Sequence, residues 1–462
     1  MKIAIIGTGY VGLVSAACLA SWGHEVVGID KDAGKIASLR QGIMPIYEPG
    51  LEELISQAVG QGLLSFTTSA APAIAGADIV MIAVGTPPRL RDGEADLSFI
   101  YAAAKEIAAS LNGFTVVVTK STVPVGTGDD IERIIARTRP DARFAIASNP
   151  EFLRQGSAVA DFQAPDRVVI GVDDERAGVL LQELYEPLRL QGIPVMTTQR
   201  RTSELIKYAA NAFLAVKISY INEMADLCES VGADVRDVAL GMGLDRRIGA
   251  ACLHAGPGYG GSCFPKDTLA LLRTSQDHGV SLRIIQESIV ANDARKRRMA
   301  LKVLNALGGN SEGRSVAILG LTFKPETDDM REAASIPLIE ALQRVGLHIR
   351  AHDPQGMANA RSLLNDVEFF DDPYECASGA DVVVMMTDWK ALKRLDLGRL
   401  AQVVRNRVLV DFRHVFDPVE ARQHGFSLST IGVQQEAAPE MTKQAPPVVT
   451  RIRHHTPVMQ NR

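Results

Sequence analysis

The sequence of 462 residues predicts an α/β fold in which two doubly wound parallel sheets are joined by a central helical domain with a long helix. Three observations predict this fold. Short apolar runs alternate with helical patterns over the first 150 residues, a helical stretch fills the middle of the chain, and the opening pattern returns after residue 311. The length agrees with several domains, because one domain typically takes about 100–200 residues.

Composition and charge exclude several classes of protein. The net charge of −5 has mixed signs and gives no broad basic surface, so we expect no nucleic-acid partner. The densest basic run, 295–298, is predicted to be the solvated end of a helix. No apolar stretch approaches the roughly 18 residues of a membrane span, and the first residues lack a signal-peptide pattern. We therefore expect a soluble protein without a membrane partner.

The cysteines indicate a reducing environment. Their number, five, is odd, they are scattered, and no pair has the CxxC spacing of a metal site. This pattern predicts reduced thiols, a cytoplasmic location and no bound metal.

The first two domains are predicted over residues 1–200 and 201–300. Strands of the first domain are short apolar runs that end at glycine or polar residues, and they are predicted at 2–6, 25–29, 78–84, 115–119 and 144–147. The central domain is predicted to open with a helix from about 202 to 231. Such a length is typical of a helix that packs against another chain or bridges two domains.

A third domain, 311–432, is predicted because the order of strands and turns at the start of the chain recurs there. The matched segments are 315–320 with 3–7, 348–353 with 26–30, and 380–387 with 77–84. Residues 433–462 are rich in glutamine and proline and lack periodicity, which predicts a disordered tail.

A dinucleotide fingerprint follows the first predicted strand. Its Gly-x-Gly-x-x-Gly pattern opens a helix, whose N-terminus and glycine backbone suit a pyrophosphate. An acid, Asp30, ends the second strand, where a carboxylate accepts hydrogen bonds from a ribose diol and repels a 2′-phosphate. The cofactor is therefore predicted to be NAD rather than NADP, although the cation Lys35 nearby points the other way. The fingerprint residues are Gly7, Gly9, Tyr10, Val11 and Gly12.

The segment 256–267, Gly-Pro-Gly-Tyr-Gly-Gly-Ser-Cys-Phe-Pro-Lys-Asp, is the most informative of the chain. Its glycines are expected to let the backbone approach a ligand closely. Cys263 ends this loop beside Lys266 and Asp267, and we expect these polar surroundings to favour its thiolate. The alternative is a buried structural cysteine. The loop favours a nucleophile.

Further polar residues are placed where chemistry is expected. Lys207 and Asn211 lie four apart on one helix face, where an ammonium and an amide can stabilise a developing oxyanion, although such a pair often faces solvent. Glu151 follows a predicted strand end and is a candidate base or water-positioning group. Ser121 and Thr122 end another strand and supply hydroxyl groups on the nicotinamide side.

Together these segments closely resemble the UDP-glucose 6-dehydrogenase family of nucleotide-sugar dehydrogenases. The resemblance covers nearly the whole chain to about residue 432, with the motifs in the family's order. Its most specific string is Gly-Gly-Ser-Cys-Phe-Pro-Lys-Asp at 260–267. The resemblance implies two Rossmann-like domains around the helical one, and a homo-oligomer of at least two chains.

The resemblance also implies roles for individual residues. Those implied for catalysis are Cys263, Lys207, Asn211, Asp267, Glu151 and Thr122. The cofactor contacts that it implies include the fingerprint residues, Asp30 and Lys35. They also include Thr86, Ser121, Thr122, Gln155, Lys266 and Arg331. Those implied to bind the substrate are Glu151, Phe152, Leu153, Lys207, Asn211, Arg247, Tyr259, Gly260, Phe323, Lys324 and Arg413. Of these, Arg247 is implied to reach the sugar of a neighbouring subunit. Gln155 is a departure, because the family commonly has glutamate there and a second carboxylate near the cofactor is thus missing.

The implied reaction is a four-electron oxidation of UDP-glucose to UDP-glucuronate by two NAD, through a thiohemiacetal and a thioester on Cys263. One alternative is a GDP-mannose or UDP-N-acetylhexosamine 6-dehydrogenase, against which Phe264 argues modestly. A two-electron hydroxyacid dehydrogenase would not need the Cys263 loop. A nucleotide-binding regulator without chemistry is disfavoured by the intact Cys263, Lys207 and Asp267.

Overall fold

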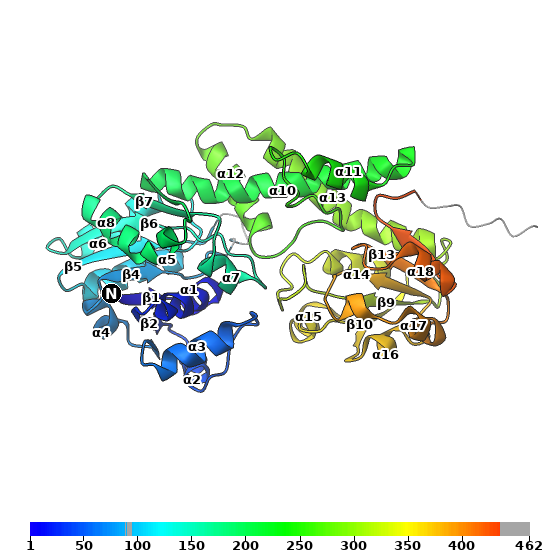
Figure 1. Cartoon of the computed structure of the whole chain (residues 1–462), viewed down its shortest axis with the longest axis horizontal. Coiled ribbons are helices and arrows are strands. Elements are labelled where there is room, and N and C mark those ends of the chain that lie inside the picture. The colour runs from blue at the N-terminus through cyan, green and yellow to red at the C-terminus, as the bar shows by residue number, and fades with distance from the viewer. Residues whose placement is uncertain (88, 90–94, 435–462) are drawn as a thin grey trace, which may run out of the picture.

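A computed structural model describes residues 1–87, 89 and 95–434 of the chain. Figure 1 shows two sheet-containing domains side by side, with the helices α10 (Arg200–Val231), α12 (Phe264–Asp277) and α13 (Arg283–Ala306) running along one edge of both. The predicted fold class is thereby confirmed. Most of the predicted tail lies outside the described residues.

The N-terminal sheet has, within the described residues, the strand order β3-β2-β1-β4-β5-β6-β7-β8. Neighbouring strands are parallel except β6 and β7, which are antiparallel. The predicted strands are found, but three were not predicted: β3, β7 and β8. The strand bounds are β1 (Lys2–Ile6), β2 (Glu25–Ile29), β3 (Leu64–Thr67), β4 (Ile79–Ile82), β5 (Phe114–Thr119), β6 (Arg143–Ser148), β7 (Val168–Val172) and β8 (Val195–Thr198).

Helices cover both faces of this sheet, because its central strands are apolar on both sides. In β1, Ile3 and Ile5 pack into one core cluster while Ala4 and Ile6 pack into the other. The helices are α1 (Tyr10–Ser21), α2 (Ala33–Arg40), α3 (Leu51–Gly60), α4 (Ala70–Ala75), α5 (Ser98–Ser110), α6 (Thr127–Thr138), α7 (Ala158–Gln163), α8 (Glu175–Leu184) and α9 (Glu186–Leu190).

The central domain is built on α10, whose 32 residues correspond to a rod about 48 Å long. The helix ends at Gly232, which takes the left-handed conformation (φ +75°) that commonly closes a helix. A short helix, α11 (Val235–Gly243), follows before the chain enters the glycine-rich loop and α12.

The C-terminal sheet repeats the strand order of the first, as β11-β10-β9-β12-β13-β14, with every pair parallel. The repeat seen in the sequence is therefore a repeat of topology. The strands are β9 (Ser315–Leu319), β10 (His348–His352), β11 (Val367–Phe369), β12 (Val382–Met385), β13 (Val408–Asp411) and β14 (Ser427–Thr430). The helices are α14 (Ser335–Arg344), α15 (Met357–Leu363), α16 (Pro373–Ala377), η1 (Leu392–Arg394), α17 (Leu397–Val403) and α18 (Pro418–Gln423).

Two points attach the C-terminal domain to the central helices. At the first, Gly308 and Gly309 follow α13 with φ +70° and +79°. At the second, the chain returns after β14, where Gly432 donates its N–H to Glu229 of α10 over 2.7 Å and Val433 forms a bridge with Asp234. Ile221 and Val303 of the central helices also belong to the core of this domain.

Candidate active site

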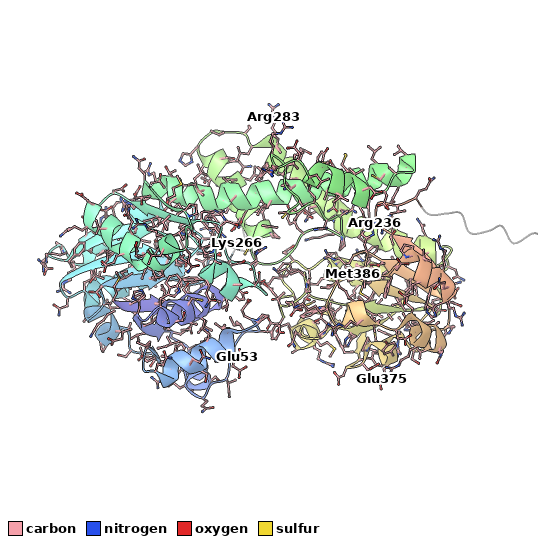
Figure 2. All side chains as sticks on the ribbon, viewed as in Figure 1. Glu53, Arg236, Lys266, Arg283, Glu375 and Met386 are labelled. Atoms are coloured by element: carbon pink, nitrogen blue, oxygen red, sulfur yellow. The ribbon has the colours of Figure 1, made fainter. Side chains whose placement is uncertain are left out.

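A cavity of about 1340 Å³ lies between the two sheet domains and below the central helices. Its walls include the carboxyl ends of the N-terminal strands, the loop that carries Cys263, and the segment 328–332 of the C-terminal domain, and residues of α5, α13 and α15 complete them. Figure 2 shows Lys266, one of the lining residues, in the region where the domains face each other. Clefts between domains are common positions for ligand sites.

The three fingerprint glycines serve different purposes. Gly7 (φ +102°) makes the turn after β1, and a Cβ on it would lie 2.6 Å from the carbonyl oxygen of Ala83. A Cβ on Gly12 would lie 1.8 Å from the carbonyl oxygen of Gly7. A Cβ on Gly9 would meet no atom within 4 Å, and this residue lines the cavity. The open backbone at Gly9 therefore leaves room for a pyrophosphate at the start of α1.

Asp30 ends β2 at the edge of the cavity. Its Oδ2 accepts hydrogen bonds from the Thr8 backbone N–H (3.0 Å), the Thr8 hydroxyl (2.8 Å) and Lys35 Nζ (2.9 Å). Burial alone would raise the pKa of Asp30, but Lys35 and the backbone N–H of Asp32, together with Thr8, lower it to about 2. The carboxylate is thus ionised at neutral pH and suits a ribose diol. Lys35 is its partner.

We expect NADP to be used far less efficiently than NAD, because a 2′-phosphate would meet the Asp30 carboxylate. Lys35 is paired with that carboxylate, so the positive charge of Lys35 is already partly neutralised. Measuring kcat/KM for both cofactors checks this, and Asp30→Ala should narrow the gap. Equal efficiencies in the unmodified protein would show that Lys35 outweighs Asp30.

The corresponding turn of the C-terminal domain is closed. Asp353 stands where Asp30 stands in the first half, but its side chain is fully buried. It binds the backbone N–H groups of Leu321 and Gly356 (both 2.6 Å) and the indole N–H of Trp389 (3.2 Å). The carboxylate of Asp353 is therefore occupied by groups of its own domain, unlike that of Asp30, which lies at the edge of the cavity.

The floor of the cavity is formed by hydroxyl-bearing residues at strand ends. The Thr86 hydroxyl donates to the carbonyl oxygen of Thr122 (2.9 Å), and the Ser121 hydroxyl donates to that of Val84 (2.7 Å). These bonds tie the end of β4 to the end of β5. All three predicted residues, Thr86, Ser121 and Thr122, line the cavity.

Cys263 lies at the N-terminus of α12, half-buried in the cavity wall. Its Sγ is 3.7 Å from the Ser262 hydroxyl. Burial and the carboxylates Glu151 and Asp267 raise the pKa of the thiol, while Lys207 and Ser262 lower it less. The surroundings therefore disfavour the thiolate, contrary to the expectation from the sequence. The helix N-terminus does favour negative charge at this sulfur.

Two buried pairs stand beside the thiol. Lys207 Nζ lies 3.1 Å from Glu151 Oε1, and Asn211 Nδ2 donates to Asp267 Oδ2 over 2.6 Å. Lys266 Nζ binds the other oxygen of Asp267 at 2.7 Å. Burial alone would lower the pKa of Lys207, but Glu151, the Cys263 thiol and Asp267 raise it above its usual value. Lys207 is thus a fixed cation, suited to holding an oxyanion rather than to accepting a proton.

Lys120 is a residue that the sequence did not single out. It is buried, and its Nζ donates to Asn149 Oδ1 (2.9 Å) and to the Tyr185 hydroxyl (3.2 Å). Burial lowers its pKa to about 8, against the opposing effect of Glu151. Through Asn149 it joins the strand ends that carry Thr122 and Glu151. The signal in the sequence that could have found Lys120 is its position directly before Ser121 and Thr122 at a strand end.

The glycines of the Cys263 loop are required by the protein's own packing. A Cβ on Gly258 would lie 2.9 Å from Asn292 Oδ1, on Gly260 2.2 Å from the carbonyl oxygen of Glu332, and on Gly261 2.7 Å from the ring of Phe323. Gly261 also lines the cavity, so the expectation that the loop backbone approaches a ligand stays a prediction. The glycines let the loop pass between α13 and the C-terminal domain.

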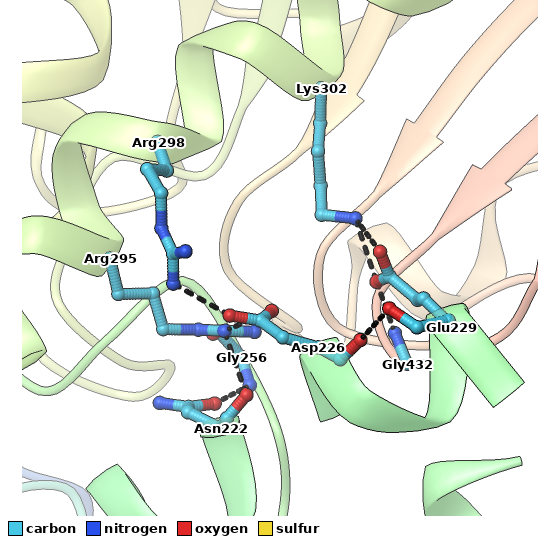
Figure 3. A network of polar contacts seen from close by, with 9 residues as sticks. Asn222, Asp226, Glu229, Gly256, Arg295, Arg298, Lys302 and Gly432 are labelled. Atoms are coloured by element: carbon cyan, nitrogen blue, oxygen red, sulfur yellow. Dashed lines mark hydrogen bonds and ion pairs between the residues drawn. The ribbon is translucent and has the colours of Figure 1, made fainter. Parts of the chain in front are cut away.

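A polar network anchors the start of this loop (Figure 3). Arg295 donates to the carbonyl oxygens of Gly256 (2.6 Å) and Asn222 (2.9 Å) and to Asp226 (2.8 Å), so that α13 and α10 hold the loop together. Arg298 shares Asp226. The prediction that 295–298 is a solvated helix end is wrong for Arg295 and Lys296, which are buried within α13. Their partners lie far away in the sequence.

The predicted substrate residues fall into two groups. Arg413 is close to the loop, since a Cβ on Gly256 would lie 3.0 Å from its guanidinium, and it donates to the carbonyl oxygens of Met386 (2.8 Å) and Phe323 (3.3 Å). Lys324 is half-buried nearby, and desolvation lowers its pKa. Arg247 stands apart, because its side chain is 89% exposed and pairs with Asp245 away from the cavity.

Four other predicted residues belong to the cavity wall or lie next to it in sequence. Leu153 and Tyr259 line the cavity, and the Leu153 N–H donates to Glu151 Oε2 over 2.6 Å. Phe152 packs against Arg167, whose guanidinium lies 3.7 Å from the ring centre, and Gly260 packs against Glu332. All five cysteines are free thiols. In the part of the chain that the structure describes, no helix is long and apolar enough to cross a membrane.

Three family models cover most of the chain in sequence order. Residues 1–189 match the NAD binding domain of the UDP-glucose/GDP-mannose dehydrogenase family, residues 201–294 its central domain, and residues 317–418 its UDP binding domain.

Named relatives agree. The chain is 56% identical to UDP-glucose 6-dehydrogenase of Rhizobium meliloti, over 94% of this chain and 99% of that protein, and 45% identical to UDP-glucose 6-dehydrogenase of Pseudomonas aeruginosa, over 94% and 97%. Among solved structures, a UDP-glucose dehydrogenase from Pyrobaculum islandicum is 40% identical with a TM-score of 0.86, covering 94% of this chain and 97% of that one.

Proposed function

Because the chain belongs to the UDP-glucose/GDP-mannose dehydrogenase family of NAD-dependent oxidoreductases, we propose that it oxidises the C6 hydroxyl of UDP-glucose to the carboxylate of UDP-glucuronate. One observation carries the proposal: a single cavity holds a dinucleotide turn and a nucleophilic thiol. The names of the relatives at 56% and 45% identity support the choice of sugar.

Cys263 is the nucleophile of the proposed reaction. NAD, held by the fingerprint turn and Asp30, would supply the hydride acceptor for two successive oxidations. Between them the sulfur adds to the C6 aldehyde, and its proton is transferred so that a thiohemiacetal forms. The second oxidation converts this to a thioester, and water then cleaves the C–S bond to give the carboxylate and return the thiol. A covalent sulfur adduct retains the aldehyde, which simple alcohol oxidation would not need.

The buried pairs beside the thiol supply the remaining groups. Lys207 and Asn211 would hold the oxygen of the tetrahedral adducts, a role supported by the raised pKa of Lys207. Asp267 would serve as acid and base, while Glu151 and Thr122 would position the hydrolytic water. Asp267 is well placed for proton transfer, since it is buried and already bonded to Asn211 and Lys266.

The uridine diphosphate would be bound by the C-terminal domain. Lys324 and Arg413 are half-buried cations that, among the described residues, form no ion pair with a carboxylate, so an anionic ligand would supply the missing charge. Phe323 lies against the glycine loop between them. Leu153, Tyr259 and Gly260 would complete the sugar site, with Phe152 packed behind.

We expect two NADH per sugar consumed, because each oxidation yields one. An absorbance assay for NADH together with quantification of UDP-glucuronate checks the ratio. A reproducible ratio of one with release of free aldehyde would contradict the four-electron reaction.

The same assay, run across a panel of nucleotide sugars, separates the alternatives. A GDP-mannose or UDP-N-acetylhexosamine 6-dehydrogenase would show its highest kcat/KM with those sugars. The fold alone does not discriminate, since a UDP-D-ManNAc dehydrogenase from Pyrococcus horikoshii superimposes with a TM-score of 0.81 at 26% identity. Oxidation of a small hydroxyacid, or no turnover with any sugar, would favour the other two alternatives.

The proposed working form is a homodimer that pairs through α10. Phe213, Tyr220 and Leu227 are spaced seven apart on this helix and are 65%, 44% and 52% exposed in the single chain. A heptad stripe of this kind is typical of helix pairing. The partner would also bring its Arg247 to a neighbouring sugar, a role supported by the position of Arg247 outside the cavity of its own chain.

Phe213→Glu is expected to give a monomer, because it places a charge at the centre of the exposed stripe. Light scattering at assay concentration measures the mass. Leu190→Glu, an equally large change at an exposed position of α9, is the matched control and should leave the mass unchanged. An unmodified protein that is monomeric and fully active would refute the dimer.

The remaining expectations are proposals as well. A cytoplasmic location is supported by the five free thiols. The proposed units are residues 1–200 for NAD, 201–300 for dimerisation and the Cys263 loop, 311–432 for the UDP-sugar, and a tail from 433.

A further inference from the structure

Gln155 forms a hydrogen bond between the two sheet domains. It lies in the loop between β6 and α7, and its Nε2 donates to Asp329 Oδ2 over 3.0 Å. Asp329 belongs to the C-terminal domain, in the segment between β9 and α14. Both residues line the cavity, so this bond closes the cavity wall where the two domains meet.

The loop that carries Gln155 is braced within its own domain. Glu48 is buried, and its carboxylate accepts the N–H of Gly156 (2.6 Å), the N–H of Ala158 (2.7 Å) and the hydroxyl of Tyr10. Tyr10 is the first residue of α1, inside the dinucleotide fingerprint. Gln155 therefore extends from a support that is continuous with the cofactor turn.

The opposite side of the contact is also fixed. Asp329 receives three hydrogen bonds from Arg331: the backbone N–H at 2.9 Å, Nε at 2.8 Å and an Nη at 2.6 Å. Arg331 also lines the cavity. In addition, the two loops touch through their backbones, because a Cβ on Gly156 would lie 2.6 Å from the carbonyl oxygen of Glu326.

Charge explains why an amide suits position 155. Burial alone would raise the pKa of Asp329, but Arg331 and Gln155 lower it, so the carboxylate is ionised at neutral pH. An ionised carboxylate can only accept hydrogen bonds, and it therefore needs a donor opposite it. The amide is turned so that Nε2 faces Asp329, although this leaves Oε1 buried without a hydrogen-bond partner among the described residues.

We propose that Gln155 is a positioning residue which latches segment 328–332 over the cofactor cavity and, through Asp329, fixes Arg331 for the cofactor. The latch is a property of NAD binding and does not depend on which sugar is oxidised. A glutamate at 155 would place two carboxylates within hydrogen-bond distance, and one of them would have to take up a proton.

The latch is tested by calorimetric titration of the full-length protein with NAD. For Gln155→Leu, which removes the bond without adding charge, we expect about threefold weaker binding, the usual effect of one hydrogen bond. For Gln155→Glu at pH 8 we expect a loss of about tenfold or more, which shrinks at pH 5.5 as the carboxylate pair takes up a proton. Gln191→Glu makes the same change at an exposed site outside the cavity and should bind like the parent.

Reversing the polarity distinguishes a latch from a merely structural role. Gln155→Glu combined with Asp329→Asn exchanges the two roles, so that position 155 carries the acceptor carboxylate and position 329 the donor amide. This double variant should bind NAD more tightly than Gln155→Glu alone. The proposal would be overturned if the double variant lost as much NAD affinity as the product of the two single losses. It would also be overturned if Gln155→Glu bound NAD with the affinity of the parent at both pH values.

Hydrogen exchange tests the latch without a measurement of NAD affinity. In the protein without NAD, peptides that cover 326–332 should exchange faster in Gln155→Leu than in Gln191→Glu. Equal protection of these peptides in both variants would also overturn the latch, whatever the outcome of the sugar assay.

Discussion

Cys263→Ser is expected to lower steady-state turnover on the order of 10³-fold or more, while NAD and the nucleotide sugar still bind. The serine hydroxyl has nearly the shape of the thiol but a far higher pKa. The pKa of the thiol is itself raised by burial and by Glu151 and Asp267. These surroundings disfavour an anionic nucleophile, so they would not help to deprotonate the serine hydroxyl. An ester, if formed, would also hydrolyse more slowly than a thioester.

Mass spectrometry after incubation with substrate and NAD measures the outcome directly. The variant should be found either unmodified or carrying a trapped glucuronyl group at residue 263. Cys252→Ser is the matched control, because this thiol is also half-buried but does not line the cavity. Near-normal turnover of Cys263→Ser would mean that the nucleophile is another group.

Gly260→Ala is expected to lose about 10²-fold in turnover and about 1–3 kcal/mol or more in the free energy of unfolding. The added Cβ would lie 2.2 Å from the carbonyl oxygen of Glu332 and 3.2 Å from Cβ of Phe323, where backbone cannot give way cheaply. Relief requires the loop to move, and Cys263 moves with it. Catalysis tolerates little displacement of a reacting atom.

Urea unfolding and initial rates measure the two effects. Gly241→Ala makes the same substitution in α11, where the new Cβ meets no atom within 4 Å, and it should stabilise the helix by about 1 kcal/mol. If both alanine variants behave alike, the close approach of Glu332 is not a constraint on the loop.

Local features of the site were predictable because their physical cause lies within a few residues. The fingerprint 7–12 and the spacing of Lys207 and Asn211 belong to this class. Others were not, since their partners are distant in sequence. The burial of Arg295 depends on Asp226, 69 residues away, and on Gly256, 39 residues away. A run of cations alone resembles a solvated surface.

The same reasoning applies to the loop glycines and to the fold. A glycine in a sequence reports that a side chain is not accommodated, but not whether a ligand or the chain itself occupies the space. Gly9 faces an open cavity, whereas Gly260 faces Glu332. The strands β3 and β8 were missed because they lie at the two edges of the sheet and bury fewer side chains than the central strands, and the antiparallel step at β7 has no local signal.

The attachment of the C-terminal domain has a mechanical consequence. Residues of α10 and α13 share one hydrophobic core with this domain, and the chain returns at Gly432 onto Glu229 of α10. Because a close-packed core resists deformation, we expect this domain and the parts of the helices packed on it to move as one unit. A change in the width of the cavity would then require this unit to move relative to the N-terminal domain, and the hydrogen bond between Gln155 and Asp329 opposes that movement.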